Sequence, residues 1–142
     1  MSGKHILVTG GAGYIGSHVV RQLGARGESV VTLDNLTTGF AKAVTHGDLV
    51  VGDTGDTETL SNLFNRYDIE TVMHFAAATV VPESVANPLK YYRNNTACTR
   101  TLLAVANAHN VKHVVFSSTA AVYGIPADGT ARETDPTAPI NP

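Results

Sequence analysis

Short apolar runs alternate along this chain with longer segments in which apolar residues recur every three or four positions. The runs are rich in β-branched residues and predict strands over residues 5–8, 29–34, 48–53, 70–76 and 112–117. Helical periodicity covers residues 14–25, 57–67 and 88–108, and residues 35–47 predict a loop with one helical turn. Strands that alternate with helices predict right-handed crossovers and a parallel sheet covered on both faces, which is the α/β class.

Capping residues agree with these helix boundaries. Gly27 stands where the first helix would end in a left-handed residue, and Asp56 stands where a side chain would cap the second. Asn87 and Pro88 fit the cap and first position of the third helix, where the missing N–H of proline is not needed.

The character of the chain changes at Ile125. Four of the six prolines lie in residues 126–142, and no apolar periodicity accompanies them. We therefore expect one domain over residues 1–124 and a proline-rich loop over residues 125–142. Because this loop directly follows the fifth strand, we expect a sheet truncated there and a missing C-terminal portion.

Composition limits the possible function classes. The 142 residues suffice for one domain with a sizeable core, and a net charge of −2 with scattered cations argues against a nucleic-acid partner. The single cysteine cannot form an internal disulfide, which favours a reducing compartment. No apolar run approaches the roughly 18 residues of a membrane span, and no room for a signal peptide precedes the first strand. These features predict a soluble, cytoplasmic protein without a membrane partner.

The first candidate site follows the first strand, where Gly10, Gly13 and Gly16 are spaced by three and a helix begins at once. Backbone N–H groups and the positive end of a helix dipole converge at such a turn and suit a pyrophosphate. Gly10 would allow the tight turn, Gly13 the approach of a ligand, and Gly16 the packing of helix on strand. Glycine patterns also occur for purely conformational reasons, so other residues must identify the ligand.

In an open parallel sheet, ligands bind beyond the carboxyl ends of the strands. Asp34 ends the second strand about 20 residues after the glycine turn, where a carboxylate binds an adenosine ribose and repels a 2′-phosphate, which favours NAD over NADP. The alternative for Asp34 is a solvated turn residue. Asp53 either approaches the adenine or forms a turn. Ser117 ends the fifth strand and Thr119 follows it, and both are either turn formers or donors to a substrate oxygen.

Several other residues have structural interpretations. His74 lies in an apolar strand, and we expect a hydrogen-bonded core histidine rather than a catalyst. Cys98 has no nearby base, so we expect a small buried residue. Tyr91 and Tyr92 are expected to pack or to form an interface. No histidines have metal-ligand spacing, so we predict no metal.

Seven segments together resemble the extended short-chain dehydrogenase/reductase family, and within it the UDP-hexose 4-epimerases. They occur in the family's order and cover nearly the whole chain. The segments are residues 9–18, 33–36, 52–53, 74–77, 83–85, 88–96 and 116–124. The resemblance implies a Rossmann-like, doubly wound parallel sheet in the order 3-2-1-4-5, of which about five strands are present.

The resemblance also implies an activity and a site. Members interconvert UDP-glucose and UDP-galactose: hydride passes from the sugar to tightly held NAD and returns to the other face of the 4-keto sugar. By similarity, the adenosine ribose lies at Asp34 and Asn35, the adenine at Asp53 and Thr54, and the UDP-sugar substrate hydroxyl at Thr119. The implied cofactor-binding residues are Gly10, Gly13, Tyr14, Ile15, Gly16, Asp34, Asn35, Asp53, Thr54, Phe75, Ala76, Ala77, Asn94 and Ser117.

Two departures from the family pattern limit the expected activity. Thr79 stands where better-known members carry a lysine that contacts the cofactor. The family's base is the tyrosine of a Tyr-x-x-x-Lys motif, and none of the five tyrosines here has a lysine four residues later. In the family this motif follows a segment resembling residues 139–142. We therefore expect this chain to hold the nucleotide but not to epimerise.

Other functions stay open. A sugar-nucleotide dehydratase shares the cofactor site, but Ala120 and Ala121 stand where that chemistry has Asp-Glu; a reductase or decarboxylase is also compatible. A non-catalytic NAD-binding sensor or interaction module would also lack the tyrosine motif. Because a truncated sheet leaves its fifth strand unpaired, we expect a homodimer or other self-association.

Overall fold

The computed structural model describes residues 3–126 and 128–142. Five parallel strands form one sheet in the order β3-β2-β1-β4-β5, which confirms the predicted fold class and topology. The strands are β1 (His5–Thr9), β2 (Ser29–Asp34), β3 (Asp48–Val51), β4 (Ile69–His74) and β5 (His113–Phe116). All lie close to their predicted positions.

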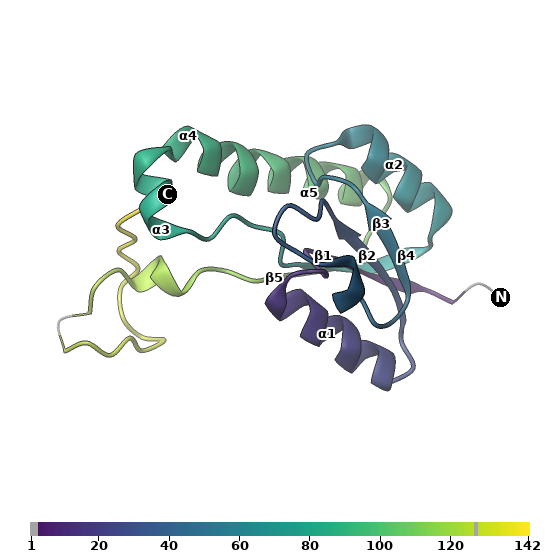
Figure 1. Ribbon diagram of the computed structural model, residues 1–142, viewed down its shortest axis with the longest axis horizontal. Helices are drawn as coiled ribbons and strands as arrows, with labels where there is room; N and C mark the ends of the chain where they lie inside the picture. Colours follow the sequence, from purple (N-terminus) through teal and green to yellow (C-terminus); the bar gives the residue numbers. More distant parts are fainter. Residues whose placement is uncertain (1–2, 127) are drawn as a thin grey trace.

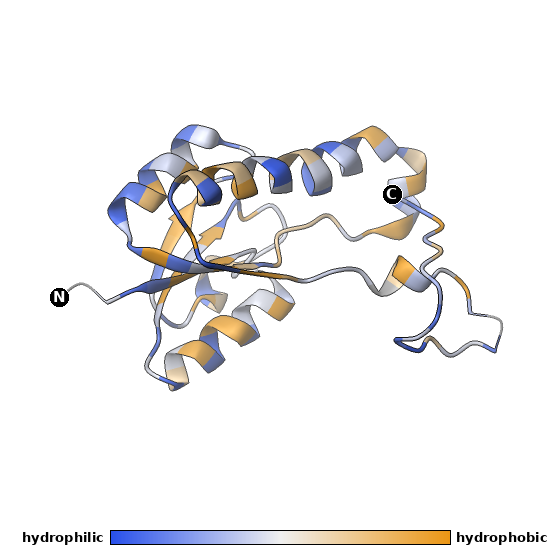
Figure 2. Ribbon diagram, turned by 180° about the vertical axis from the view of Figure 1, so that it is seen from behind, coloured by the Kyte–Doolittle hydropathy of each residue, from blue (hydrophilic) through white to orange (hydrophobic). Residues whose placement is uncertain are grey.

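Helices cover both faces of this sheet (Figure 1). One face carries α1 (Tyr14–Ala25), and the other carries α2 (Thr57–Arg66) and α5 (Cys98–Ala108). Successive residues of a strand point to opposite faces, so Leu7 packs with Leu60 and Leu102 while its neighbour Val8 packs with Val20 of α1. Two cores therefore sandwich the sheet, and Figure 2 shows the apolar residues of the strands between the helical layers.

The predicted caps form. Gly27 has φ +79°, and the bonds from Gly27 N to Gly24 O (3.0 Å) and from Glu28 N to Leu23 O (3.1 Å) close the end of α1. The Asp56 carboxylate accepts from the N–H of Glu58 at 3.0 Å and so begins α2. Local sequence thus sets where these helices start and stop.

The predicted helix over residues 88–108 is one helical run with an irregular middle. It consists of α4 (Pro88–Tyr91), a π-helical segment η2 (Tyr92–Ala97), and α5. In a π-helix each N–H reaches one residue further back than in an α-helix, and such segments are frequent at functional sites. The Asn87 side chain caps the start by accepting from Lys90 N at 3.3 Å. Apolar periodicity does not distinguish such a segment from regular helix.

Three short elements complete the fold. The expected helical turn in the loop before β3 is η1 (Ala41–Ala43), whereas α3 (Val81–Ala86) and η3 (Ala120–Tyr123) were not predicted. Each spans too few residues to show a periodic pattern. Figure 1 shows that α3, which contains both apolar residues and Glu83 and Ser84, lies away from the sheet. No helix in the described part of the chain is long and apolar enough to cross a membrane.

Beyond η3, the described residues form no further helix or strand, as expected for a proline-rich loop. The loop folds back on earlier parts of the chain. Ala138 N donates to Val122 O at 2.9 Å, and the Asn141 amide donates to Ser84 Oγ on α3 at 2.9 Å. The division of the chain at residue 124 stays a prediction.

Within the described residues, β5 pairs with β4 and forms one edge of the sheet. All four of its residues are exposed, and Phe116 exposes 60% of its surface. An exposed apolar edge strand favours pairing with another chain. Self-association stays a prediction that this edge supports.

His74, the last residue of β4, connects this strand to the neighbouring strand β1 and to helix α5. It is buried, and its Nδ1 lies 2.6 Å from Thr9 Oγ1 while its Nε2 lies 2.7 Å from Thr99 Oγ1. Because the Thr99 hydroxyl donates to Asn95 O at 2.6 Å, it accepts from Nε2–H, and a neutral His74 then accepts from Thr9 on Nδ1. The prediction of a satisfied core histidine is confirmed.

Replacing Gly16 by alanine tests the packing of α1 on the turn before it. An added Cβ would lie 2.2 Å from the carbonyl oxygen of Gly10, so helix or turn must shift. Overpacking of this kind costs about 1–3 kcal/mol, and we expect Gly16→Ala to lower the free energy of unfolding in urea by that amount. Gly3→Ala is the control, since its nearest neighbour is 3.8 Å away. Equal stability of the two variants would contradict the packing role.

Burial lowers the pKa of His74 below its ordinary value of 6.5. Near that pH the unfolded chain therefore takes up a proton that the folded chain does not, and stability falls as the pH falls. We expect urea midpoints of the wild type to decline between pH 7.5 and 5.5 more steeply than those of His74→Gln. Parallel declines in the two proteins would show that His74 does not titrate in this way.

Candidate functional site

The glycine turn lies where the strand order reverses, between β1 and β4. Gly10 has φ +71° and its N–H donates to Leu33 O of β2 at 2.9 Å. A Cβ on Gly10 would lie 2.7 Å from Ala76 N, in the segment that follows β4. Gly10 thus allows the predicted tight turn and also the close approach of a third stretch of backbone. Such a switch point is where open α/β sheets bind ligands.

The N-terminus of α1 opens toward this edge. Gly13 is its N-cap, and no side chain of the described residues caps it. The first N–H groups of a helix have no acceptor within it, so they are available to an anion there. Tyr14 and Ile15 begin the helix with exposed side chains. Gly16 is buried and serves packing, as the crowding around its Cα indicates.

Asp34 ties the glycine turn to the end of β2. Its Oδ2 accepts from Ala12 N at 2.9 Å and its Oδ1 accepts from Leu36 N at 2.8 Å. Only 8% of the residue is exposed, so Asp34 is not solvated, while its bond to the N–H two residues later is the turn contact that the alternative interpretation expected. The carboxylate therefore has a defined position beside the turn. The predicted contact with a ribose stays a prediction.

A hydrogen bond between Asn35 and Asp53 connects the carboxyl ends of β2 and β3. The Asn35 amide donates to Asp53 Oδ2 at 2.9 Å, and Gly55 N donates to Asp53 Oδ1 at 2.8 Å. The turn role of Asp53 is thus observed, and each carboxylate oxygen retains capacity for another donor. Thr54 is buried beside it. The predicted adenine contact is compatible with this arrangement and stays a prediction.

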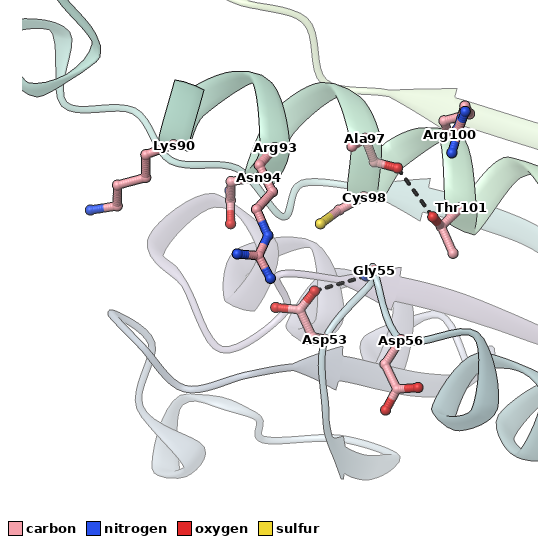
Figure 3. A pocket seen from close by; sticks show the side chains of 10 residues that line it. All are labelled: Asp53, Gly55, Asp56, Lys90, Arg93, Asn94, Ala97, Cys98, Arg100 and Thr101. Carbon is pink, nitrogen blue, oxygen red and sulfur yellow. Dashed lines mark hydrogen bonds between the residues drawn. The ribbon is translucent and has the colours of Figure 1, made fainter. Parts of the chain in front are cut away.

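A cavity of about 560 Å³ separates the loop after β3 from the long helical run (Figure 3). Sequence reasoning selected Asp53 and Asn94 from its lining and missed the others. Several of these lie three or four residues apart on one face of the helical run, a signal that would have grouped them. The lining residues are Asp53, Gly55, Asp56, Lys90, Arg93, Asn94, Ala97, Cys98, Arg100 and Thr101.

Cys98 is only half-buried and lines this cavity, which corrects the expectation of a small buried residue. Its Sγ packs against Gly55, where an added Cβ would lie 2.6 Å from the sulfur. Burial, with the Asp53 carboxylate nearby, raises the pKa of the Cys98 thiol. A raised pKa favours the protonated thiol, which is the less nucleophilic form.

The segment after β4 is held between the glycine turn and the long helix. Phe75 N donates to Thr9 O at 3.0 Å, and Ala76 lies against Gly10. The Asn95 amide accepts from Ala78 N at 2.8 Å and donates to Ala78 O at 2.9 Å. Sequence reasoning missed Asn95, because a helical asparagine gives no sign of the loop that it binds. Phe75, Ala76 and Ala77 thus lie along the edge that includes the glycine turn.

Two asparagines in η2 divide their contacts. Asn94 lines the cavity and its amide donates to Asn95 Oδ1 at 2.9 Å. Asn94 therefore lies between the cavity and Asn95, which binds the segment after β4, and its predicted approach to the cofactor stays a prediction. Nearby, Tyr91 is buried and its hydroxyl accepts from Val80 N at 3.1 Å, whereas Tyr92 is exposed. Of the two roles expected for Tyr91, packing and an interface, the structure shows packing.

The residues after β5 lie apart from the cavity. Ser117 N donates to His74 O at 3.1 Å, which continues the strand pairing. Thr119 caps η3 by accepting from Ala121 N at 3.1 Å. Both are exposed, and the turn-forming role of Thr119 is observed. Among the described residues, no cluster of three or more metal-ligating side chains occurs, and the absence of a metal stays a prediction.

Known proteins match this chain along nearly its whole length. It is 52% identical over 138 residues to the UDP-glucose 4-epimerase of Lacticaseibacillus casei and 51% identical over 137 residues to that of Halalkalibacterium halodurans. Each alignment covers 96% of this chain. The chain spans less than half of these relatives, 42% and 41% of their lengths.

Solved structures match the fold as well. The UDP-glucose 4-epimerase of Brucella ovis in complex with NAD has a TM-score of 0.92 at 42% identity, over 98% of this chain and 43% of that one. The Thermus thermophilus enzyme in complex with NAD has a TM-score of 0.90 at 38% identity, over 96% and 45%. The model of the NAD dependent epimerase/dehydratase family matches residues 6–142, and the chain belongs to this family.

Proposed function

We propose that this chain holds the adenosine and pyrophosphate portions of NAD and is the NAD-binding part of a UDP-hexose 4-epimerase that interconverts UDP-glucose and UDP-galactose. The observation that carries the proposal is the junction of Gly10, Ala12 and Asp34. There an uncapped helix N-terminus and a positioned carboxylate lie at the switch point of the sheet. Identities of about 50% to UDP-glucose 4-epimerases support the reaction class.

The proposed roles follow the chain from the turn outward. Backbone N–H groups at Tyr14 and Ile15 bind the pyrophosphate, because the first N–H groups of a helix have no acceptor within it. The Gly13 N–H already donates to Gly10 O at 3.1 Å, so Gly13 contributes by letting the backbone approach the ligand closely. Asp34 and Asn35 bind the adenosine ribose. The adenine lies at Asp53 and Thr54, beside the cavity that Asn94 lines. Phe75, Ala76 and Ala77 border the path toward the nicotinamide, with Ser117 beyond them.

The chemistry proposed for the whole enzyme is reversible oxidation at C4 of the sugar, for which NAD supplies a hydride acceptor. Thr119 has a hydroxyl that hydrogen-bonds the sugar oxygen. A base is also needed, and the sequence has no Tyr-x-x-x-Lys motif to supply it. We therefore propose that these residues alone bind the cofactor without turning over sugar.

The dehydratase alternative is weaker, because Ala120 and Ala121 after Thr119 cannot transfer protons.

Three further features belong to the epimerase proposal: a cytoplasmic location, a division of the chain at residue 124, and self-association through β5. The exposed edge of β5 supports self-association.

Isothermal titration of the 142-residue chain tests nucleotide binding. We expect NAD to bind at least about tenfold more tightly than NADP, because the Asp34 carboxylate repels a 2′-phosphate. Asp34→Asn should weaken NAD binding by about tenfold or more, since it removes a charged hydrogen-bond acceptor. Asp68→Asn, the same change just before β4 and therefore at the amino ends of the strands, away from the glycine turn, should bind NAD like the wild type. Equal affinity for NAD and NADP would contradict the assignment of Asp34.

Incubation with NAD and UDP-glucose tests the proposed lack of turnover. We expect chromatography to detect no UDP-galactose after hours with the purified chain, because no tyrosine base with a neighbouring lysine is present. A full-length relative serves as the positive control. Production of UDP-galactose by the chain itself would show that another group acts as the base.

A further inference from the structure

Three cations line the cavity between the loop after β3 and the long helical run, and one of them faces an acid across the cavity, whereas Lys90 is ion-paired with Glu83 of α3. Lys90, Arg93 and Arg100 all belong to the helical run. Figure 3 shows the Arg93 guanidinium reaching across the cavity toward the Asp53 carboxylate, whereas the Lys90 side chain extends away from it. Arg93 lies in η2, next to Asn94.

Arg93 and Asp53 face one another without forming an ion pair among the described residues. The Asp53 oxygens instead accept from Asn35 and Gly55. Two opposite charges that stop short of contact leave space between them, and here that space is part of a cavity of about 560 Å³. Ala97 and Cys98 give this part of the cavity an uncharged wall, since the thiol is protonated.

A flat, neutral base with an exocyclic amino group matches this arrangement. A carboxylate accepts from an amino group, and Asp53 has lone pairs left for it. A guanidinium is planar and weakly hydrated, so it stacks on aromatic faces in a way that a lysine ammonium does not. Asp53 would therefore hold the base at its amino edge, and Arg93 on the opposite side of the cavity would cover the face of the base.

We propose that Arg93 is a specificity-determining residue that stacks on the purine of the bound dinucleotide and closes the cavity over it. This inference rests on the proposed binding of NAD. The clamp consists of the loop with Asp53 and Gly55 on one side and Arg93 on the other. The side chain is exposed without the base, so covering the base orders a flexible arginine.

Isothermal titration with ADP-ribose tests this role in four variants of the full 142-residue chain. Arg93→Gln and Arg93→Lys should each weaken binding about fivefold to tenfold, because both lose the planar guanidinium. Lys90→Gln and Arg100→Gln remove the same charge from the same helical run and should stay within twofold of the wild type. Thermal unfolding should be unchanged in the Arg93 and Arg100 variants, since these two side chains are exposed and form no ion pair among the described residues. Lys90→Gln also breaks the exposed ion pair with Glu83, so Arg100→Gln is the better matched control.

The outcomes separate this inference from the proposed function. If wild-type chain does not bind ADP-ribose, both fail. If it binds and Arg93→Lys equals the wild type, then charge alone suffices and stacking is wrong. If all three Gln variants weaken binding equally, the cations act as a general positive field and Arg93 has no special role. Unchanged binding by Arg93→Gln also overturns the inference while leaving the proposed function intact.

Discussion

Close contact between three stretches of backbone at the end of β1 is the constraint on which the rest of the structure depends. The turn at Gly10, the first residues of α1 and the segment after β4 approach so closely that a Cβ at Gly10 or Gly16 would overlap backbone atoms. This contact brings the start of α1 to the switch point of the sheet. An anion site at a helix N-terminus and a ligand crevice between strands thereby become one place.

Around this contact, polar side chains bind backbone and so set the positions of the loops. Asp34 connects the glycine turn to the loop after β2, and Asn95 connects the long helix to the segment after β4. His74 joins β1, β4 and α5 through two threonines. A buried polar group without a partner is costly, so breaking any of these hydrogen bonds is unfavourable and the segments they connect stay in place. The edge of the sheet is consequently organised before any ligand arrives.

Local patterns predicted most of the elements of the fold and part of the lining of the candidate site. Strands and helix caps followed from apolar periodicity and from Gly27, Asp56 and Asn87, because those signals act between near neighbours in sequence. The sheet order followed from the family resemblance instead, since strand order depends on contacts between distant segments. The π-helical η2 and the short α3 were missed, since neither alters the periodicity over enough residues. Asn95 was missed in favour of Asn94, because its partner at Ala78 lies in a loop that only folding brings near.

The sequence alone determined the α/β class, the glycine turn and the identity of the acids at the strand ends. These depend on residue type and on spacing along the chain, which a linear pattern contains. The tertiary structure decided which side chains lie next to one another. It buried Asp34 against Ala12, set Arg93 across from Asp53, and used Thr119 as a cap on η3. The physical reason is that a cavity is formed by side chains distant in sequence, and their separation is fixed only when the helical run packs on the sheet.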